Sequence, residues 1–381
     1  MKKFVLLPFV ILISSCFNPE LSTTENSTSE FAATTLKLNS GNEIFKNPTS
    51  STDCGYYLSS TSVSQRATSF LVGNKIYFSV PCKTSDSGTG GWHYGMMSWS
   101  TGDLSTSWID GDVGTGEQAL FDRSEVDSNG HQLRNWIEMQ VTYNGTDYRG
   151  LIYKYYSSSE YGGSSGFYTS PVAFSDPNSF SPSDIDVNNR GVIEYNFNDN
   201  TWKGKTSRTM DIEYKNSNYL VYFTTTNSPT EDTYYIVLRQ SADLINFDDP
   251  TTFLLEGYRD PNVFEYKGSV YMIAFETASN SWKLIPGESY TSFDVSKAVT
   301  VEIGSKIYGK GGWDDTPLYT AYPNHEPRLA GVEVVFDKVY LFYLAGGFNQ
   351  LPTDPNSTGS YNGVPYDGPR GMGVMEITIQ E

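Results

Sequence analysis

The chain has 381 residues, and its formal net charge at pH 7 is −18. This acidity argues against nucleic acid or an anionic phospholipid surface as the ligand, because phosphate binding requires clusters of Lys and Arg. Aromatic residues make up 15% of the chain, and long amphipathic helical patterns are absent from it, so the sequence favours an all-β protein.

The first residues are typical of a secretory signal. Met1-Lys2-Lys3 precedes an apolar run over residues 4–13, which is too short to span a bilayer. The segment Ile13-Ser14-Ser15-Cys16 resembles the bacterial lipobox, which implies a signal peptide over residues 1–15 and acylation of Cys16. Phe17 follows in place of Asp, so the sorting rule implies the outer membrane. The alternative is an ordinary signal peptide with an incidental Cys.

Residues 16–50 are rich in Ser, Thr, Asn and Glu, so we expect a lipidated Cys16 and a flexible tether there. The membrane would then be contacted only through the lipid. Residues 51–381 remain as the folded domain. An even number of remaining cysteines in an oxidising compartment favours a Cys54–Cys82 disulfide; two buried free thiols are the alternative.

A short cassette, two strands joined by a turn, recurs along the predicted domain. Gapless copies are Phe70–Tyr77, Ile212–Tyr219 and Phe264–Tyr271, and looser copies start at Val141 and Val334. The successive starts are 71, 71, 52 and 70 residues apart. Repetition at such a period indicates radially repeated sheets. The sequence therefore predicts an all-β fold, a five-bladed β-propeller of four-stranded antiparallel blades, with a large β-sandwich as the alternative.

A second repeat supports the first. A Ser-containing turn closed by an aromatic follows each of the first four starts, as in Ser241-Ala-Asp243-Leu244 with Phe247. Asp and Ser side chains bond their own backbone in turns, and we expect the aromatic to pack beneath.

In a propeller the first strand of every blade lines the central channel. We therefore expect residues just before the cassette starts to converge near the axis. Those with ionisable side chains are Arg66, Glu138, Arg208, Asp211, Arg259, Asp260, His325, Glu326 and Arg328.

One of these segments carries a family resemblance. Arg259-Asp260-Pro261, on a predicted inner strand, resembles the Arg-Asp-Pro motif of the five-bladed propeller glycosidases. These include the arabinanases and xylosidases of glycoside hydrolase family 43, the invertases and the levansucrases. His325-Glu326-Pro327-Arg328 stands where that group carries its catalytic Glu. The resemblance covers about residues 55–381; the blade pattern is fairly specific and the tripeptide alone is weak.

The resemblance implies a role for each matching residue. Asp260 would orient the sugar and tune the acid, and Glu326 would be the general acid. Arg259 and Arg328 would bond sugar hydroxyls or hold the carboxylates.

A third carboxylate, the base or nucleophile, lies two blades earlier in that group. Glu138 is the only acid there, where the family has Asp, and it is one residue off phase, so it needs a bulge or shift to face the channel. Asp211 is the reserve candidate. Glycoside hydrolysis needs one protonated and one ionised carboxyl flanking the bond. Glu138, Asp260 and Glu326 would supply them if they converge.

No cofactor is required by this chemistry, and the three His residues have no zinc spacing, so no metal ligand is assigned. His325 would contact sugar or a channel cation, since some family members hold a structural Ca²⁺ on the axis. Trp136 is a candidate for stacking on a sugar ring.

The leading hypothesis is a secreted, surface-anchored glycosidase that acts on a neutral poly- or oligosaccharide in carbohydrate metabolism. The alternative is a non-catalytic propeller lipoprotein that binds glycan or protein, which the missing base motif favours. For the individual residues, Asp260 capping a turn and a Glu326–Arg328 salt bridge are the structural alternatives.

Overall fold

The computed structural model describes side chains for residues 68–77 except 74, 139–152, 169–176, 184–186, 189, 210–225, 233–248, 253–301, 329–343 and 374–380, and only the backbone of further strands between residues 35 and 373. These strands belong to one compact unit, Ala33–Glu381.

The described strands form five antiparallel sheets of four or five strands each. The first contains β3 (Thr68–Val72), β4 (Lys75–Lys83), β5 (Trp92–Ser100) and β6 (Thr106–Trp108). The second contains β7 (Glu138–Tyr143), β8 (Tyr148–Tyr156), β9 (Gly166–Phe174) and β10 (Gly191–Ile193). The third contains β11 (Met210–Lys215), β12 (Asn218–Thr226), β13 (Tyr234–Ser241) and β14 (Leu255–Glu256).

The fourth sheet contains β15 (Tyr258–Tyr266), β16 (Ser269–Glu276) and β17 (Ser281–Ser289), to which the short strands β18 (Ser292–Phe293) and β19 (Val299–Val301) pair on either side of the 3₁₀ helix η4 (Val295–Lys297). The fifth contains β20 (Arg328–Val335), β21 (Lys338–Gly346), β24 (Arg370–Gln380), β1 (Thr35–Leu38) and β2 (Asn42–Phe45). A separate two-strand ladder joins β22 (Ser360–Tyr361) to β23 (Val364–Pro365).

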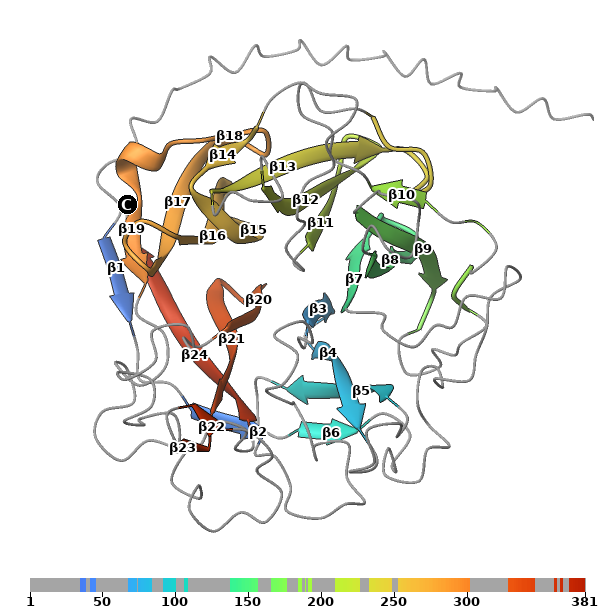
Figure 1. Cartoon of the computed structure of the whole chain (residues 1–381), viewed down its shortest axis with the longest axis horizontal. Coiled ribbons are helices and arrows are strands. Elements are labelled where there is room, and N and C mark those ends of the chain that lie inside the picture. The colour runs from blue at the N-terminus through green and yellow to red at the C-terminus, as the bar shows by residue number, and fades with distance from the viewer. Residues whose placement is uncertain are drawn as a thin grey trace, which may run out of the picture. The chain divides into compact units, whose positions relative to one another are not determined.

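The first strands of the five sheets form a closed cycle of contacts. Strand β3 contacts β7, β7 contacts β11, β11 contacts β15, β15 contacts β20, and β20 returns to β3. Figure 1 shows these five strands facing the middle, with the later strands of each sheet further out. Sheets that radiate from a ring of first strands are a β-propeller, so the prediction of an all-β propeller is confirmed.

Each repeated cassette is the first hairpin of a sheet. Phe70 pairs with Tyr77 and Phe264 with Tyr271, as the gapless alignment requires, and each pair of rings stacks. The third copy differs, because Ile212 pairs with Val221 and not with Tyr219. Its turn lies at Asn216-Ser217, both in the left-handed backbone region, which is one residue later than the alignment indicates.

The second repeat is also a set of turns. The Ser241 hydroxyl accepts the N–H groups of Asp243 and Leu244, and the Asp243 carboxylate accepts those of Ile245 and Asn246. The aromatic of this turn, Phe247, packs against the core cluster of the third sheet. The predicted side-chain to backbone bonding is therefore present in this copy.

The hydrophobic core is divided among the interfaces between neighbouring sheets. Phe264 and Tyr271 of the fourth sheet pack with Leu341 and Tyr343 of the fifth. The largest fully buried side chains are Tyr77, Tyr222, Tyr271, Tyr343 and Phe223. Large aromatic rings fill the space between sheets, so each added sheet brings its own core.

Strands β1 and β2 lie in the segment for which we expected a tether over residues 16–50. Both pair with the last strand, β24. The alternation of Leu36 and Leu38 with polar residues is a strand pattern, but it is short and surrounded by Ser, Thr and Asn. The folded domain thus includes residues before position 51, in β1 and β2.

The expected lipid and disulfide cysteines are not described. Cys16 and Cys54 lie outside the described residues, and Cys82 is described only as backbone of β4. Both features stay predictions. Among the described residues, no helix has the length and apolar character needed for a membrane crossing.

Candidate active site

A small pocket lies where the five first strands meet. It is lined by the residue directly before each cassette start, namely Ser69, Gln140, Asp211, Val263 and Glu333. Residues 330–332 and Asn262 complete the lining. The cavity measures about 20 Å³, which is room for about one water molecule. Residues far apart in the chain therefore converge on the axis, but the space at this depth is too small for a sugar.

Asp211 is held on the axis by backbone groups. Its Oδ2 accepts the Val263 N–H from the next sheet at 2.5 Å, and its Oδ1 accepts the N–H of Ile212 at 3.0 Å. Enclosure by protein raises the pKa of Asp211 to about 6, while the two backbone N–H groups oppose the shift. The reserve candidate is thus in the channel, with both carboxylate oxygens engaged.

Glu333, on β20, is the second carboxyl of this pocket. Its Oε1 accepts the Ser69 hydroxyl at 2.5 Å. Burial raises its pKa to about 8, against the effect of Ser69 and with a further increase from nearby Asp211. Both carboxyls of the pocket therefore have raised pKa values, and that of Glu333 is raised further than that of Asp211.

Glu213, two residues after Asp211 on β11, extends this group of acids. Burial, and then the Asp211 charge, raise the pKa of Glu213 well above its ordinary value. Our sequence reasoning missed both Glu213 and Glu333. A signal for Glu333 was present, because it directly precedes Val334, the start of the fifth cassette.

Arg259 and Asp260 lie near the start of β15, at a bulge. The pairing of β15 with β16 shifts between Arg259 and Asn262, and Asp260 has a φ of 59°. The Asp260 side chain is 2% exposed and bonds the guanidinium of Arg259. That guanidinium also lies over the ring of Phe275, 4.1 Å from its centroid. A buried carboxylate is thus compensated by a cation that is itself packed in place.

The Asp260 backbone has partners of its own. Its N–H donates to Thr224 Oγ1 on β12 at 2.9 Å, and its carbonyl accepts Asn262 Nδ2 at 3.2 Å.

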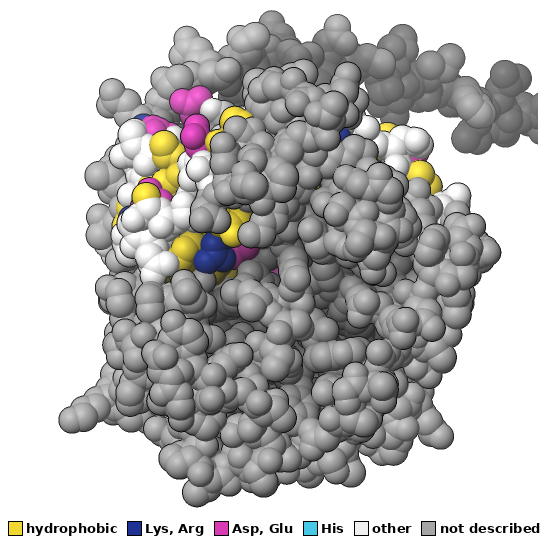
Figure 2. Space-filling model, in the orientation of Figure 1, with side chains coloured by type: hydrophobic (Ala, Val, Ile, Leu, Met, Phe, Trp, Pro, Cys, Tyr) yellow, Lys and Arg dark blue, Asp and Glu magenta, His cyan; other side chains and the backbone are white. Residues whose placement is uncertain are grey.

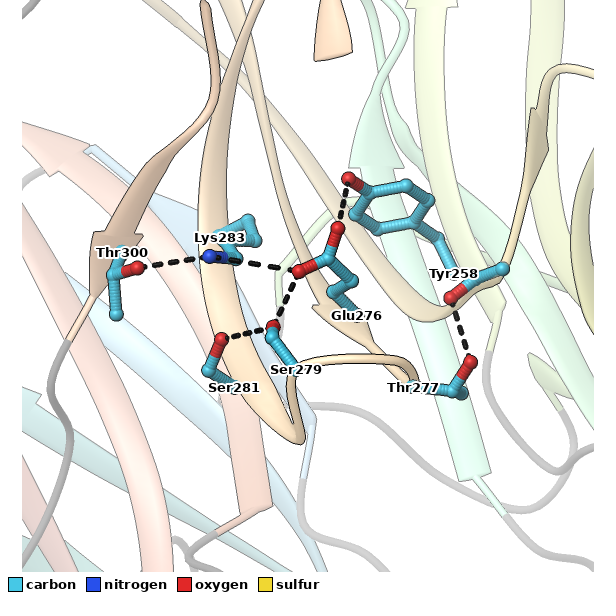
Figure 3. Close-up of polar contacts among 8 residues, drawn as sticks. Tyr258, Glu276, Thr277, Ser279, Ser281, Lys283 and Thr300 are labelled. Atoms are coloured by element: carbon cyan, nitrogen blue, oxygen red, sulfur yellow. Dashed lines mark hydrogen bonds and ion pairs between the residues drawn. The ribbon is translucent and has the colours of Figure 1, made fainter. Parts of the chain in front are cut away.

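A polar network lies at the same end of the fourth sheet (Figure 3). Glu276, which pairs with Tyr258 across β15 and β16, accepts the Tyr258 hydroxyl at 2.9 Å and the Ser279 hydroxyl. Lys283 lies 3.5 Å from Glu276 and donates to Thr300 at 2.9 Å. The Ser279 hydroxyl is the main cause that lowers the pKa of Glu276. This network fixes the sheet end next to Arg259.

The other predicted site residues are not described in full. His325, Glu326 and Trp136 lie outside the described residues, and Glu138 and Arg328 are described only as backbone, opening β7 and β20. The expected shift at Glu138 is not seen in the described β7–β8 ladder, which is regular from Glu138 to Tyr143. Whether Glu138 and Glu326 meet Asp260 stays a prediction.

Within the described part of the chain, no three His, Cys, Asp or Glu side chains are grouped to hold a metal ion. Both oxygens of Asp211 and one of Glu333 already accept hydrogen bonds. A structural Ca²⁺ on the axis stays a prediction, because His325 lies outside the described residues.

Comparison with known proteins supports the fold. A scan with protein-family models gives no match, and a search of curated proteins gives none either. Among solved structures, a family 117 glycoside hydrolase of Zobellia galactanivorans superposes with a TM-score of 0.50 at 11% identity, covering 90% of each chain.

Two further structures give lower scores. A family 43 glycoside hydrolase of Xanthomonas citri has a TM-score of 0.46 at 9% identity, over 84% of this chain and 90% of that one. A family 32 β-fructofuranosidase of Bombyx mori has a TM-score of 0.47 at 14% identity, over 83% of this chain and 62% of the longer enzyme. The closed ring of sheets and the family 117 match together show that the chain has the fold of the propeller glycosidases.

Proposed function

We propose that this protein is a surface-anchored glycoside hydrolase that cleaves glycosidic bonds of a neutral poly- or oligosaccharide in its central channel. The observation that carries the proposal is the Arg259–Asp260 pair. It is a buried carboxylate at a left-handed bulge of an inner strand, in a fold that glycosidases use. A strained, buried acid with a dedicated cation is typical of a functional site.

The chemistry is assigned as follows. Glu326 is the general acid, Glu138 is the base or nucleophile, and Asp260 orients the sugar between them. Glu138 needs no bulge for this task, because it lies two residues before the pocket-lining Gln140 on the regular strand β7 and so belongs to the same face. Arg259 compensates the charge of Asp260, and Arg328 and His325 bind sugar hydroxyls. Asp211 has both oxygens engaged by backbone N–H groups, which suits a structural task better than that of the reserve base.

Several observations support a neutral glycan as substrate. The net charge of −18 disfavours a polyanion. Figure 2 shows basic, acidic and hydrophobic side chains gathered near the middle of one face, among atoms that are not described. Such a mixture suits a sugar, which has both hydroxyls and apolar ring faces. The Xanthomonas citri enzyme was solved in complexes with xylotriose and with xylose.

The envelope location belongs to the same proposal. Cleavage before Cys16 and its acylation would tether the propeller to the outer membrane, and a Cys54–Cys82 disulfide would fit that compartment. Metabolic labelling with an alkyne fatty acid tests the anchor, with Cys16→Ser as the unlabelled control.

The activity is tested by the release of reducing ends from a panel of neutral glycans that includes arabinan, xylan, fructan, galactan and agarose. We expect Glu326→Gln and Asp260→Asn to lower the rate by at least about 100-fold. Asp337→Asn, at an exposed turn of the fifth sheet, is the control and retains the rate. Equal activity in Glu326→Gln and the wild type would remove the acid assignment.

The second candidate is a non-catalytic glycan-binding propeller. It is favoured by the departure from the family pattern at Glu138, where the group has Asp. Binding of a glycan without turnover, unchanged in Glu138→Gln and Glu326→Gln, would establish it in place of the hydrolase.

A further inference from the structure

We propose that Thr224 and Asp211, both on the third sheet, are positioning residues that clamp the bulged segment Asp260–Val263 of the fourth sheet and thereby set the place of Asp260. The catalytic part of this inference rests on the proposed hydrolase function. The mechanical part does not.

The segment needs such support because its own sheet does not supply it. Pairing along β15 goes from Arg259 with Phe275 directly to Asn262 with Ile273. Asp260 and Pro261 are thus left opposite a single residue of β16, and Pro261 has no N–H to donate. Asp260 also has a φ of 59°, a region that non-Gly residues occupy only when their surroundings impose it.

The third sheet holds this segment at both ends. At one end, Thr224 Oγ1 on β12 accepts the Asp260 N–H at 2.9 Å. At the other, Asp211 Oδ2 on β11 accepts the Val263 N–H at 2.5 Å. Thr224 and Asp260 are both buried, so an unmade bond there would leave a polar group unsatisfied. The two acceptors therefore fix the segment relative to the neighbouring sheet.

Thr224 and Asp211 hold the backbone of the segment Asp260–Val263, whereas Arg259 holds the side chain of Asp260. Arg259 bonds the Asp260 carboxylate and is packed against Phe275. Removal of the Thr224 hydroxyl would thus leave carboxylate and cation present while freeing the N–H that sets their position. Small displacements of an oriented catalytic group lower reaction rates strongly. The Thr224 variants therefore test the position of Asp260 without removing its carboxylate.

The matched variants are Thr224→Val, Thr224→Ser and Thr225→Val. Valine keeps the shape and removes the hydroxyl, serine keeps the acceptor, and Thr225 is the adjacent fully buried residue on the same strand. For hydrolysis of the glycan found active with the wild type, we expect Thr224→Val to lower kcat by about 10-fold to 100-fold with little change in KM. Thr224→Ser should stay close to the wild type, and so should Thr225→Val.

A second readout needs no activity. Hydrogen–deuterium exchange is followed by mass spectrometry in a peptide that spans residues 257–264. We expect faster exchange there in Thr224→Val and wild-type protection in Thr224→Ser and Thr225→Val. Unchanged exchange in Thr224→Val overturns the clamp. Faster exchange with unchanged kcat on an active glycan overturns the positioning role.

The failure of the proposed function looks different. If the wild type hydrolyses no glycan while Thr224→Val still loosens residues 257–264, the clamp stands and the hydrolase proposal falls. If Thr224→Val does not fold, Asp211→Ala, which removes both acceptor oxygens, takes its place. It should loosen the Val263 end, and unchanged exchange would overturn the clamp.

Discussion

The hydroxyl of Ser69 donates to the carboxyl of Glu333 at 2.5 Å, across 264 residues of sequence. Ser69 lies on the first strand of the first sheet and Glu333 on the first strand of the last. This hydrogen bond therefore joins the two ends of the ring at its axis. Enclosure by protein raises the pKa of Glu333 although the Ser69 hydroxyl favours the ionised carboxylate, so ionisation at high pH should oppose the folded state.

Stability should fall as the pH rises because of Glu333. Its pKa of about 8 in the folded protein lies above the ordinary carboxyl value of the unfolded chain. The stabilisation is therefore complete below about pH 4.5 and is lost as the pH rises through about 8. Asp211 and Glu213 are shifted in the same direction. We expect a decrease on the order of a few kcal/mol, measured by denaturant unfolding between pH 5 and 9.

The control for this effect is Glu333→Gln, which keeps an oxygen that can accept from Ser69 but cannot ionise. Its stability should vary less with pH between 6 and 9 than that of the wild type. Other carboxyls, among them Glu265 and Glu276, have lowered pKa values. Their ionisation therefore changes the stability only at pH values below this window. A wild type that grows more stable toward pH 9 would contradict the assignment.

Gly331→Ala should destabilise the ring at the same place. An added Cβ would lie 1.8 Å from Ser69 Oγ and 2.8 Å from its Cβ, so β20 and β3 would have to separate. We expect a loss of about 1–3 kcal/mol in the free energy of unfolding. In a double-mutant cycle with Ser69→Gly, the pair should lose less than the sum of the single changes. Additive losses would show that this contact is not the cause.

Asp260→Asn and Asp260→Ala should differ in stability although both remove the charge. Asn tolerates a left-handed backbone better than Ala does, and Asp260 has a φ of 59°. We expect Asp260→Ala to have the lower melting temperature. Exposed Asp337, with a φ of 60°, is the matched position, because it tests the backbone effect without the ion pair. Equal melting temperatures for Asn and Ala at both positions would contradict the argument.

Asp243→Ala should cause an acid-dependent loss. The backbone N–H groups of Asn246 and then Ile245 lower the pKa of Asp243 to about 2. The Asp243 stabilisation is therefore present above about pH 3.8 and disappears as the pH falls through about 2. Since the residue is exposed, we expect only about 1 kcal/mol at pH 6 and less at pH 3, measured by urea unfolding at both values. A larger loss of stability in Asp243→Ala at pH 3 than at pH 6 would contradict this assignment.

The propeller could be predicted because its signal is local. Phe70 with Tyr77 and Phe264 with Tyr271 are hairpin partners only a few residues apart, so strand pattern and turn type are contained in one cassette. The slip in the third copy could not be predicted. Lys215-Asn216-Ser217-Asn218 offers two adjacent turn positions, and packing against the neighbouring sheets selects between them.

The candidate site was predicted in part. Of the predicted site residues, Arg259 and Asp260 lie at the bulge of β15 and Asp211 accepts the Val263 N–H of the same strand, while their roles stay predictions. Thr224 could not have been recognised, because a Thr on a second strand has no sequence feature that marks a bond to the next sheet. Glu333 satisfies the rule for residues on the axis, because it directly precedes Val334, but it lies outside the family-like segment 325–328.

The repeat, the strands and the motif that contains Asp260 can be recognised in the amino-acid sequence, because they depend on neighbours a few residues apart. Which acids come close to one another, and how far their pKa values are raised, depends on the closed ring. Ring closure brings Ser69 to Glu333 and Asp211 to Val263, and it removes these carboxyls from most of their water. Their charge is then set by desolvation and by partners that are distant in the chain.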